Sequence, residues 1–229
     1  KSSESLLANN IYVNQQANSQ FFSNVTTFNG GYVRNNIHVE MNGEYADAKL
    51  YGLYLVDRKQ YVDNQVEVIH NQPNTSSNQL YKGIADDEAG ANFNGHVIVK
   101  PHAQGIAAYQ INKNIALTDD VKITTHPFLE IYADDVKCSH GATIGQLDEE
   151  AMFYLRSRGI CKRNARMLLM YAFANNVADY VKIPELRNRL NEMIQKRLSG
   201  ELSICDQCIL HCSNKKSFDF EFKIKPFSN

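Results

Sequence analysis

The stretch YVRNNIHVEM, residues 32–41, alternates apolar and polar side chains along most of its length. Successive side chains of an extended chain point to opposite sides, so Val33, Ile37, Val39 and Met41 fall on one face. This period of two, together with the β-branched residues, is typical of a half-buried strand. We therefore predict a strand here, with these four side chains pointing inward.

Similar runs continue along the chain as far as about Gly145. The clearest are AKLYGLYLV (48–56), QVEVIHNQ (65–72), GHVIVKPHAQ (95–104) and VKITTHPFLEIYA (121–133). Segments rich in Gly, Asn and Asp, such as MNGEYAD and DDEAGANFNGH, separate the runs and are turn signals. The first part of the chain thus predicts ten or more strands with no helix between them.

Three architectures fit such a series of strands: a sandwich, a barrel and a parallel β-helix. Two features favour the β-helix. Clean two-residue hairpin turns are scarce, and many polar positions carry amide side chains, which can stack in ladders from coil to coil. These are Asn35, Asn36, Asn64, Asn71, Asn78 and Asn112. Because no strict repeat period is visible, the strand pattern alone leaves all three architectures open.

The periodicity becomes helical after Gly145. In LDEEAMFYLRSRGI (147–160), Asp148 is the expected N-cap of a helix that Gly159 ends. A second helix is expected in CKRNARMLLMYAFANNVADYV (161–181). A third is expected in PELRNRLNEMIQKRLSG (184–200), with Pro184 in its first turn and Gly200 closing it. The expected apolar stripes are Ala165, Leu168, Leu169, Ala172, Val177 and Val181 in the second helix, and Leu186, Leu190, Met193, Ile194 and Leu198 in the third.

The chain is accordingly divided into a strand-rich body (residues 1–145), a C-terminal helical domain (146–200) and a Cys-rich tail (201–229). Basic residues outnumber acidic ones in the helical domain. Its surface is either a solvated helix face or a docking site for an acidic partner.

Composition narrows the function classes. The 229 residues are 43% hydrophobic and 21% charged, with a net charge of -1, which points to neither nucleic acid nor an anionic membrane as a partner. No apolar run is long enough for a bilayer, and the first ten residues do not have the pattern of a signal peptide. The five cysteines are odd in number and crowd the C-terminus, which indicates a reducing, cytoplasmic location rather than a disulfide framework.

Common enzyme motifs are absent. Without a GxxxxGK[ST] loop, this chain is not expected to bind a nucleotide through a P-loop, and neither GxSxG, HExxH nor a Rossmann fingerprint follows a strand. A carbohydrate-active β-helix enzyme remains an alternative, since it would need only acidic or basic side chains that project from neighbouring coils.

Two groups of residues are candidates for metal binding. In CDQCILHC, Cys205, Cys208 and Cys212 are spaced so that they would share a helix face, and thiolates suit zinc or an iron–sulfur cluster. A metal-binding module centred there is a further alternative. In CSH, Cys138 and His140 would share one face of a strand, but two ligands are too few to close a site. Ordinary structural roles are the competing interpretation of both groups.

The residues around Cys138 carry a long resemblance. The segment from His126 to Val181, which contains ADDVKCSHGATIGQLDEE (133–150), closely resembles the C-terminal signature of the SufB/SufD family of iron–sulfur cluster assembly scaffolds. KPHAQGIAAYQINKNIALTDD (100–120) is similar to the same family. SufB chains tend to carry an acidic residue after the motif histidine, whereas Gly141 stands here, so the resemblance is to the SufD branch.

The resemblance implies a right-handed parallel β-helix followed by a C-terminal helical domain. It also implies a non-enzymatic scaffold that pairs with SufB and docks the SufC ATPase through its C-terminal helices. The motif histidine, His140 here, would face a SufB cysteine and take part in building a nascent iron–sulfur cluster, with Cys138 as a secondary candidate. Family members usually have an N-terminal helical domain, so we expect this chain to be a fragment. A homodimer through the SufB-facing surface is plausible for the isolated subunit, and no family role extends to CDQCILHC.

Overall fold

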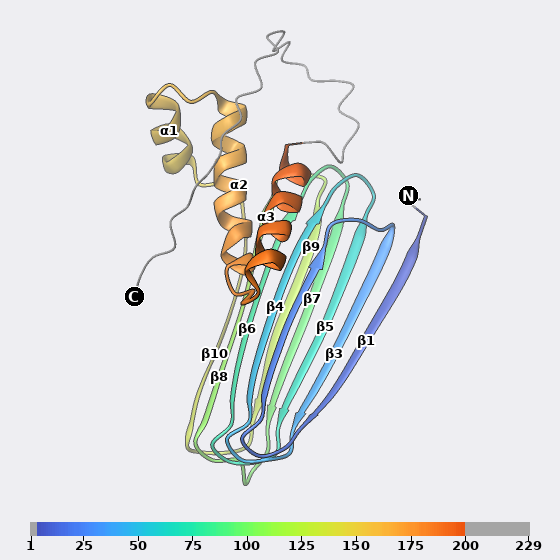
Figure 1. Cartoon of the computed structure of the whole chain (residues 1–229), viewed down its shortest axis with the longest axis vertical. Coiled ribbons are helices and arrows are strands. Elements are labelled where there is room, and N and C mark those ends of the chain that lie inside the picture. The colour runs from blue at the N-terminus through green and yellow to red at the C-terminus, as the bar shows by residue number, and fades with distance from the viewer. Residues whose placement is uncertain (1–3, 200–229) are drawn as a thin grey trace.

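Ten parallel-paired strands wind into a β-helix in the computed structural model, which describes residues 4–199 (Figure 1). The odd-numbered strands form one sheet in the order β1-β3-β5-β7-β9, and the even-numbered strands form the other in the order β10-β8-β6-β4-β2. The strands are β1 (Leu6–Gln15), β2 (Gln20–Thr27), β3 (Tyr32–Met41), β4 (Asp47–Val56), β5 (Tyr61–His70), β6 (Ser76–Ala85), β7 (Gly90–Val99), β8 (Ile106–Ala116), β9 (Lys122–Ile131) and β10 (Val136–Gly145).

Every strand pair within the two sheets is parallel, and each strand lies in register on the strand one coil earlier. This arrangement excludes the sandwich and the barrel and confirms the β-helix. The distance along the chain between stacked residues varies from 26 residues, between Leu6 and Tyr32, to 32 residues, between Gly90 and Lys122. The variable coil length explains why the sequence shows no strict repeat.

The inward residues predicted for the first stretch are confirmed, because Val33, Ile37, Val39 and Met41 are all buried between the two sheets. Burial of one such side chain stabilises the fold by about 1.5–3 kcal/mol. Some aromatic rings in the interior lie so close to the next coil that only a glycine, which has no side chain, fits opposite them. A Cβ atom on Gly83 would lie 1.9 Å from the ring of Tyr54, its register partner in β4.

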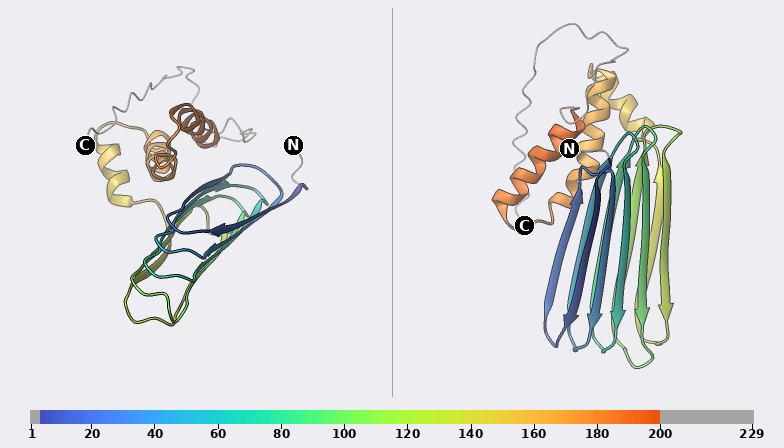
Figure 2. Two further views of the ribbon diagram at one scale, coloured as in Figure 1. Left: turned by 60° about the horizontal axis from the view of Figure 1, so that its bottom comes forward. Right: turned by 90° about the vertical axis from the view of Figure 1, so that its right-hand side faces the viewer.

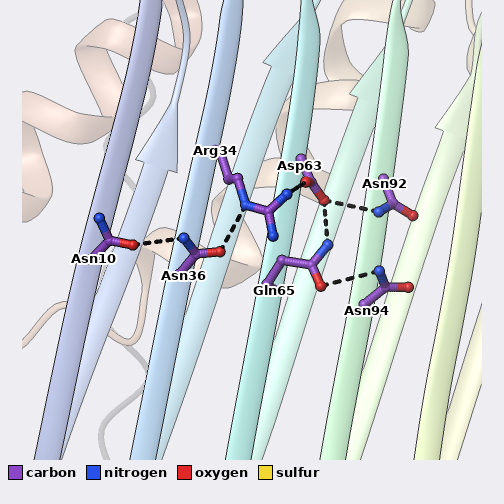
Figure 3. A network of polar contacts seen from close by, with 7 residues as sticks. All are labelled: Asn10, Arg34, Asn36, Asp63, Gln65, Asn92 and Asn94. Atoms are coloured by element: carbon purple, nitrogen blue, oxygen red, sulfur yellow. Dashed lines mark hydrogen bonds and ion pairs between the residues drawn. The ribbon is translucent and has the colours of Figure 1, made fainter.

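Amide ladders run between the coils, as the asparagine pattern predicted. Inside the β-helix, Asn35 Nδ2 donates to Asn64 Oδ1 at 2.9 Å. On the outer face of the odd-numbered sheet, a second network joins all but the last of its strands (Figure 3). Its bonds are Asn10–Asn36 (2.6 Å), Arg34–Asn36 (3.0 Å), Arg34–Asp63 (3.0 Å), Asp63–Gln65 (2.6 Å), Asp63–Asn92 (2.8 Å) and Gln65–Asn94 (3.1 Å). These side chains pair neighbouring coils as stacked amides do in cross-β structures.

One buried histidine makes the stability of the fold depend on pH. His70 is fully buried, its Nδ1 lies 2.7 Å from Thr75 Oγ1, and its Nε2 lies 2.9 Å from Ser77 Oγ. Burial lowers the pKa of His70 from 6.5 to about 4. Between these two values the unfolded chain binds a proton that the folded chain does not, so stability is lost as the pH falls from about 6.5 to about 4.

We expect His70 alone to remove about 3 kcal/mol of unfolding free energy over this range. Urea unfolding at a series of pH values measures it as the difference between the unmodified chain and a His70→Gln variant. A His102→Gln variant, changed at an exposed histidine in the turn before β8, is the control. Equal pH slopes for the His70 variant and the unmodified chain would contradict the prediction.

Three helices follow the last strand: α1 (Glu149–Ser157), α2 (Lys162–Ala178) and α3 (Pro184–Leu198). The predicted ends that fall within residues 4–199 agree with the structure, whereas Gly200, predicted to close the third helix, lies outside the described residues. Asp148 caps α1 by accepting from the backbone N–H groups of Glu150 and Ala151, Gly159 follows it with a φ of 84°, and Pro184 begins α3. Figure 2 shows α2 and α3 against the outer face of the even-numbered sheet. Their contacts with it include the stacked rings of Tyr51 and Tyr180, 4.1 Å apart.

The predicted apolar stripes of α2 and α3 are partly wrong. Ala165, Val177, Val181 and Ile194 are buried as expected, but Ala172, Leu186 and Met193 are exposed. Instead, α2 buries Met170, Ala174 and Ala178, and α3 buries the charged Arg197. The reason lies in the neighbours of α2: it packs against β4 and β6 and also against α3, so Met170, Ala174 and Ala178 face the shared core in place of Ala172.

No helix within residues 4–199 combines the length and the hydropathy of a membrane span.

Candidate functional site

The last coil of the β-helix presents two long strand edges. Among the described residues, no strand pairs with the outer side of β9 or β10, which end the two sheets. Each of these strands is ten residues long. Unpaired backbone N–H and C=O groups on such edges are a template for pairing with another chain. This end of the β-helix is therefore suited to contact a partner.

Cys138 and His140 both lie on β10 and have their register partners on β8. Cys138 stacks on Ala108 and His140 stacks on Gln110, and both partners are buried in the interior. In parallel strands that pair in register, paired residues point to the same side of the sheet. Cys138 and His140 therefore share the inward face of the last coil. The structure brings these two candidate residues together, as their spacing suggested.

Their environments differ. Cys138 is half-buried against Val97, Val99 and Ile106, and burial raises the pKa of its thiol, partly offset by a hydrogen bond with the Ala108 backbone. A protonated thiol is a poor nucleophile and a poor metal ligand. His140 is exposed, because no further coil covers it in the described part of the chain. Of the two, His140 is the side chain that an incoming group can reach.

Beneath His140 lies a column of buried amides that sequence reasoning did not identify as part of a site. Gln110 Nε2 donates to Gln79 Oε1 at 2.9 Å, and both side chains are fully buried. Beside them, Asn112 and Asn114 bond to each other and to the hydroxyl of Tyr54, whose pKa burial raises to about 12. The sequence alone does not show which residues pair between β6, β8 and β10, so it could not place these amides under the last coil.

No metal site is complete within residues 4–199, because no three His, Cys, Asp or Glu side chains converge there. Cys138 and His140 remain two potential ligands without a third. Cys205, Cys208 and Cys212 lie outside the described residues. Any metal or cluster bound by His140 would need further ligands from another chain or from residues outside 4–199.

A second polar row, on the outer face of the odd-numbered sheet, was also not predicted. Glu67 lies between His38 (2.6 Å) and His96 (3.4 Å), and His96 reaches Glu130 at 3.0 Å. A shallow groove of about 490 Å³ runs over the row. Each of these two carboxylates is paired with a histidine, so neither is set out as the free acid or base that a glycosidase needs.

The helical domain keeps part of its apolar surface open. No residue of α1 is buried, and Phe153 and Tyr154 are 75% and 57% exposed. The basic residues of the helices are not all available to a partner. Arg197, one of them, is buried in an ion pair with Asp57 at 2.8 Å. An exposed aromatic pair on a helix rimmed by charge is typical of a protein-binding surface.

Comparison with known proteins identifies the family. The family model described as "SUF system FeS cluster assembly, SufBD core domain" matches residues 1–173. The chain is 36% identical over 179 residues to the iron–sulfur cluster assembly protein SufD of Escherichia coli, covering 78% of this chain and 42% of that protein. It is 39% identical over 164 residues to a SufBD family protein of Synechocystis, covering 72% of this chain and 36% of that protein.

The similarity extends to plants: Protein ABCI7, chloroplastic, of Arabidopsis thaliana is 32% identical over 185 residues, which cover 80% of this chain and 39% of the relative. The chain spans less than half the length of the curated relatives it matches. The matched region includes the whole β-helix and the last coil with His140. The chain therefore belongs to the SufB/SufD family of iron–sulfur cluster assembly proteins and is SufD-like.

Proposed function

We propose that this chain is a non-catalytic scaffold subunit that pairs with SufB and presents His140 to a nascent iron–sulfur cluster at their interface. The observation that carries the proposal is the exposed His140 on the inward face of a coil whose two strand edges are unpaired within residues 4–199. The cluster is cargo here, because it is assembled on the complex and passed on.

The chemistry of the last coil supports a shared site. His140 offers one imidazole, and Cys138 is half-buried with a raised thiol pKa, so this chain supplies too few ligands for a cluster. A SufB chain that pairs along β9 and β10 would bring its own thiolate opposite His140. A second copy of this chain could use the same edges, which makes a homodimer the competing state when SufB is absent.

The helices give the scaffold a route for movement. We infer that SufC docks on the helical domain and that ATP is bound and hydrolysed by SufC, in the cytoplasm. The outer face of the even-numbered sheet carries α2 and α3, and the last strand of the same sheet is β10, which carries His140. A displacement of the helices by SufC would therefore act on the sheet that positions the histidine.

The test of docking uses the exposed aromatic pair of α1. We expect Phe153→Ala combined with Tyr154→Ala to weaken binding of SufC by tenfold or more, since buried aromatic anchors dominate protein interfaces and each is worth about 2 kcal/mol or more. Calorimetric titration with the matching SufC measures the change.

Tyr12→Ala is the matched control, because Tyr12 is 77% exposed on β1, which belongs to the sheet that does not carry the helices. Equal SufC affinity for the unmodified chain and the double variant would remove α1 from the proposed contact. Failure of the unmodified chain to bind either SufC or SufB would count against the scaffold role itself.

A further inference from the structure

The amide column of Gln79 and Gln110 ends directly under His140. These three residues are register partners in three successive coils, Gln79 on β6, Gln110 on β8 and His140 on β10. Adjacent strands of a sheet lie about 4.8 Å apart, which is a spacing that stacked side chains bridge by hydrogen bonds. The bond from Gln110 to Gln79 already spans one such step.

Gln110 is closely packed, and its Oε1 atom is left without a hydrogen-bond partner among the described residues. Its side chain is fully buried, and it fits only because the facing strand has Gly95, where a Cβ atom would lie 2.2 Å from Gln110 Nε2. Within the described residues, Gln110 Oε1 is buried without a hydrogen-bond partner. A buried acceptor left unpaired destabilises the fold, so this oxygen is retained at a penalty.

The position of this oxygen follows from the ladder. In a stack of amides, a group that donates its N–H to the coil below leaves its oxygen available to the coil above. The coil above Gln110 is the last one, and the residue at the matching position is His140. No other described coil lies beyond it.

We propose that Gln110 is a positioning residue for His140: the two side chains are not bonded in this structure, but a turn of the exposed imidazole toward the interior lets Gln110 Oε1 accept a hydrogen bond from one ring N–H, which fixes the imidazole tautomer and ring orientation. The proposal rests on the proposed function, in which His140 takes part in cluster assembly. With one nitrogen protonated and bonded inward, the other nitrogen has its lone pair free and turned toward the open end. Histidines that bind metals are commonly oriented by such an acceptor on the second nitrogen.

The direct test needs no partner protein. Nitrogen-15 NMR of the histidine side chains in the full chain reports the tautomer of His140, assigned by its loss in His140→Ala. We expect Gln110→Leu to change the tautomer ratio by about fivefold, as expected for the loss of one ordinary hydrogen bond. Gln110→Glu keeps an acceptor at this position and should keep the preferred tautomer.

Gln79→Leu is the matched control, because it removes the same kind of buried amide one coil further from His140. A purely structural role predicts that Gln79→Leu and Gln110→Leu change the His140 signal equally. That result, or an unchanged ratio in Gln110→Leu, would overturn the proposal. Unfolding curves identify any variant that fails to fold, and Gln110→Glu then decides between an acceptor role and packing.

A second measurement separates this inference from the proposed function. In cluster assembly by the complex with SufB and SufC, Gln110→Leu should slow assembly by about tenfold or more, and Gln110→Glu should restore much of it. If His140→Ala assembles clusters normally while Gln110 still controls the tautomer, the function fails and the hydrogen bond stands. If His140→Ala abolishes assembly and Gln110→Leu has no effect on it or on the tautomer, the positioning role fails alone.

Discussion

Replacing His140 with alanine is expected to abolish iron–sulfur cluster assembly by the complex with SufB and SufC. Loss of a group that only orients a metal-ligating histidine costs 10–100-fold, so loss of the histidine itself should cost about a hundredfold or more. The fold should not suffer, because His140 is exposed on the last coil and supports no further coil in the described part of the chain. Absorbance of the cluster during reconstitution measures the loss.

His126→Ala is the matched control for this experiment. His126 is also an exposed histidine of the last coil, but it lies on β9, where the alternation turns it to the outer face. The complex with the His126→Ala variant should assemble clusters at the rate of the unmodified complex. Assembly by His140→Ala at the rate of the unmodified complex, with both variants folded, would refute the role of His140.

The second large effect is expected at the attachment of α3 to the β-helix. Arg197 is buried, and its Nη2 atom lies 2.8 Å from Asp57 Oδ1 and donates to Gln60 Oε1 at 3.0 Å. Arg197→Ala would leave the Asp57 carboxylate, largely buried, without its cation. Breaking a buried pair in this way costs about 3–5 kcal/mol of unfolding free energy.

Urea unfolding measures this effect, and Lys196→Ala is the control, because Lys196 is an exposed cation in the same turn of α3. The control should change the unfolding free energy by less than about 0.5 kcal/mol. Replacing both Arg197 and Asp57 with apolar residues should recover much of the loss, as it does for many buried ion pairs. Equal stability of Arg197→Ala and Lys196→Ala would show that the pair does not anchor α3.

Much of the fold could be predicted from local sequence patterns. The alternation around Val39 gave strands and their inward faces, and Asp148, Gly159 and Pro184 gave helix ends, because these signals depend on the residue and its near neighbours. The choice of a β-helix did not follow as firmly, since the coils differ in length and sandwiches use similar strands. The buried side of α3 was predicted only in part: Ile194 was expected, but Arg197 was missed because its burial depends on an ion pair with the distant Asp57, just after β4.

The candidate site was predicted in part, for a related reason. The spacing of Cys138 and His140 placed them on one face of a strand, and this is what the register shows. The difference in their exposure depends on which coil comes last, and Gln110, the amide beneath His140, lies 30 residues earlier in the chain. Such long-range stacking leaves no local signal, so Gln110 could only be found from the structure.

The in-register stacking of the coils has a consequence for how the molecule comes apart. A stack in which each coil touches only its neighbours behaves as a one-dimensional lattice, whose terminal units are held by one interface instead of two. Fraying should therefore begin at the ends, and one end carries His140. Binding of a partner to β9 and β10 would supply the missing neighbour, so the same event that completes the site would also make its coil an interior unit of a longer stack.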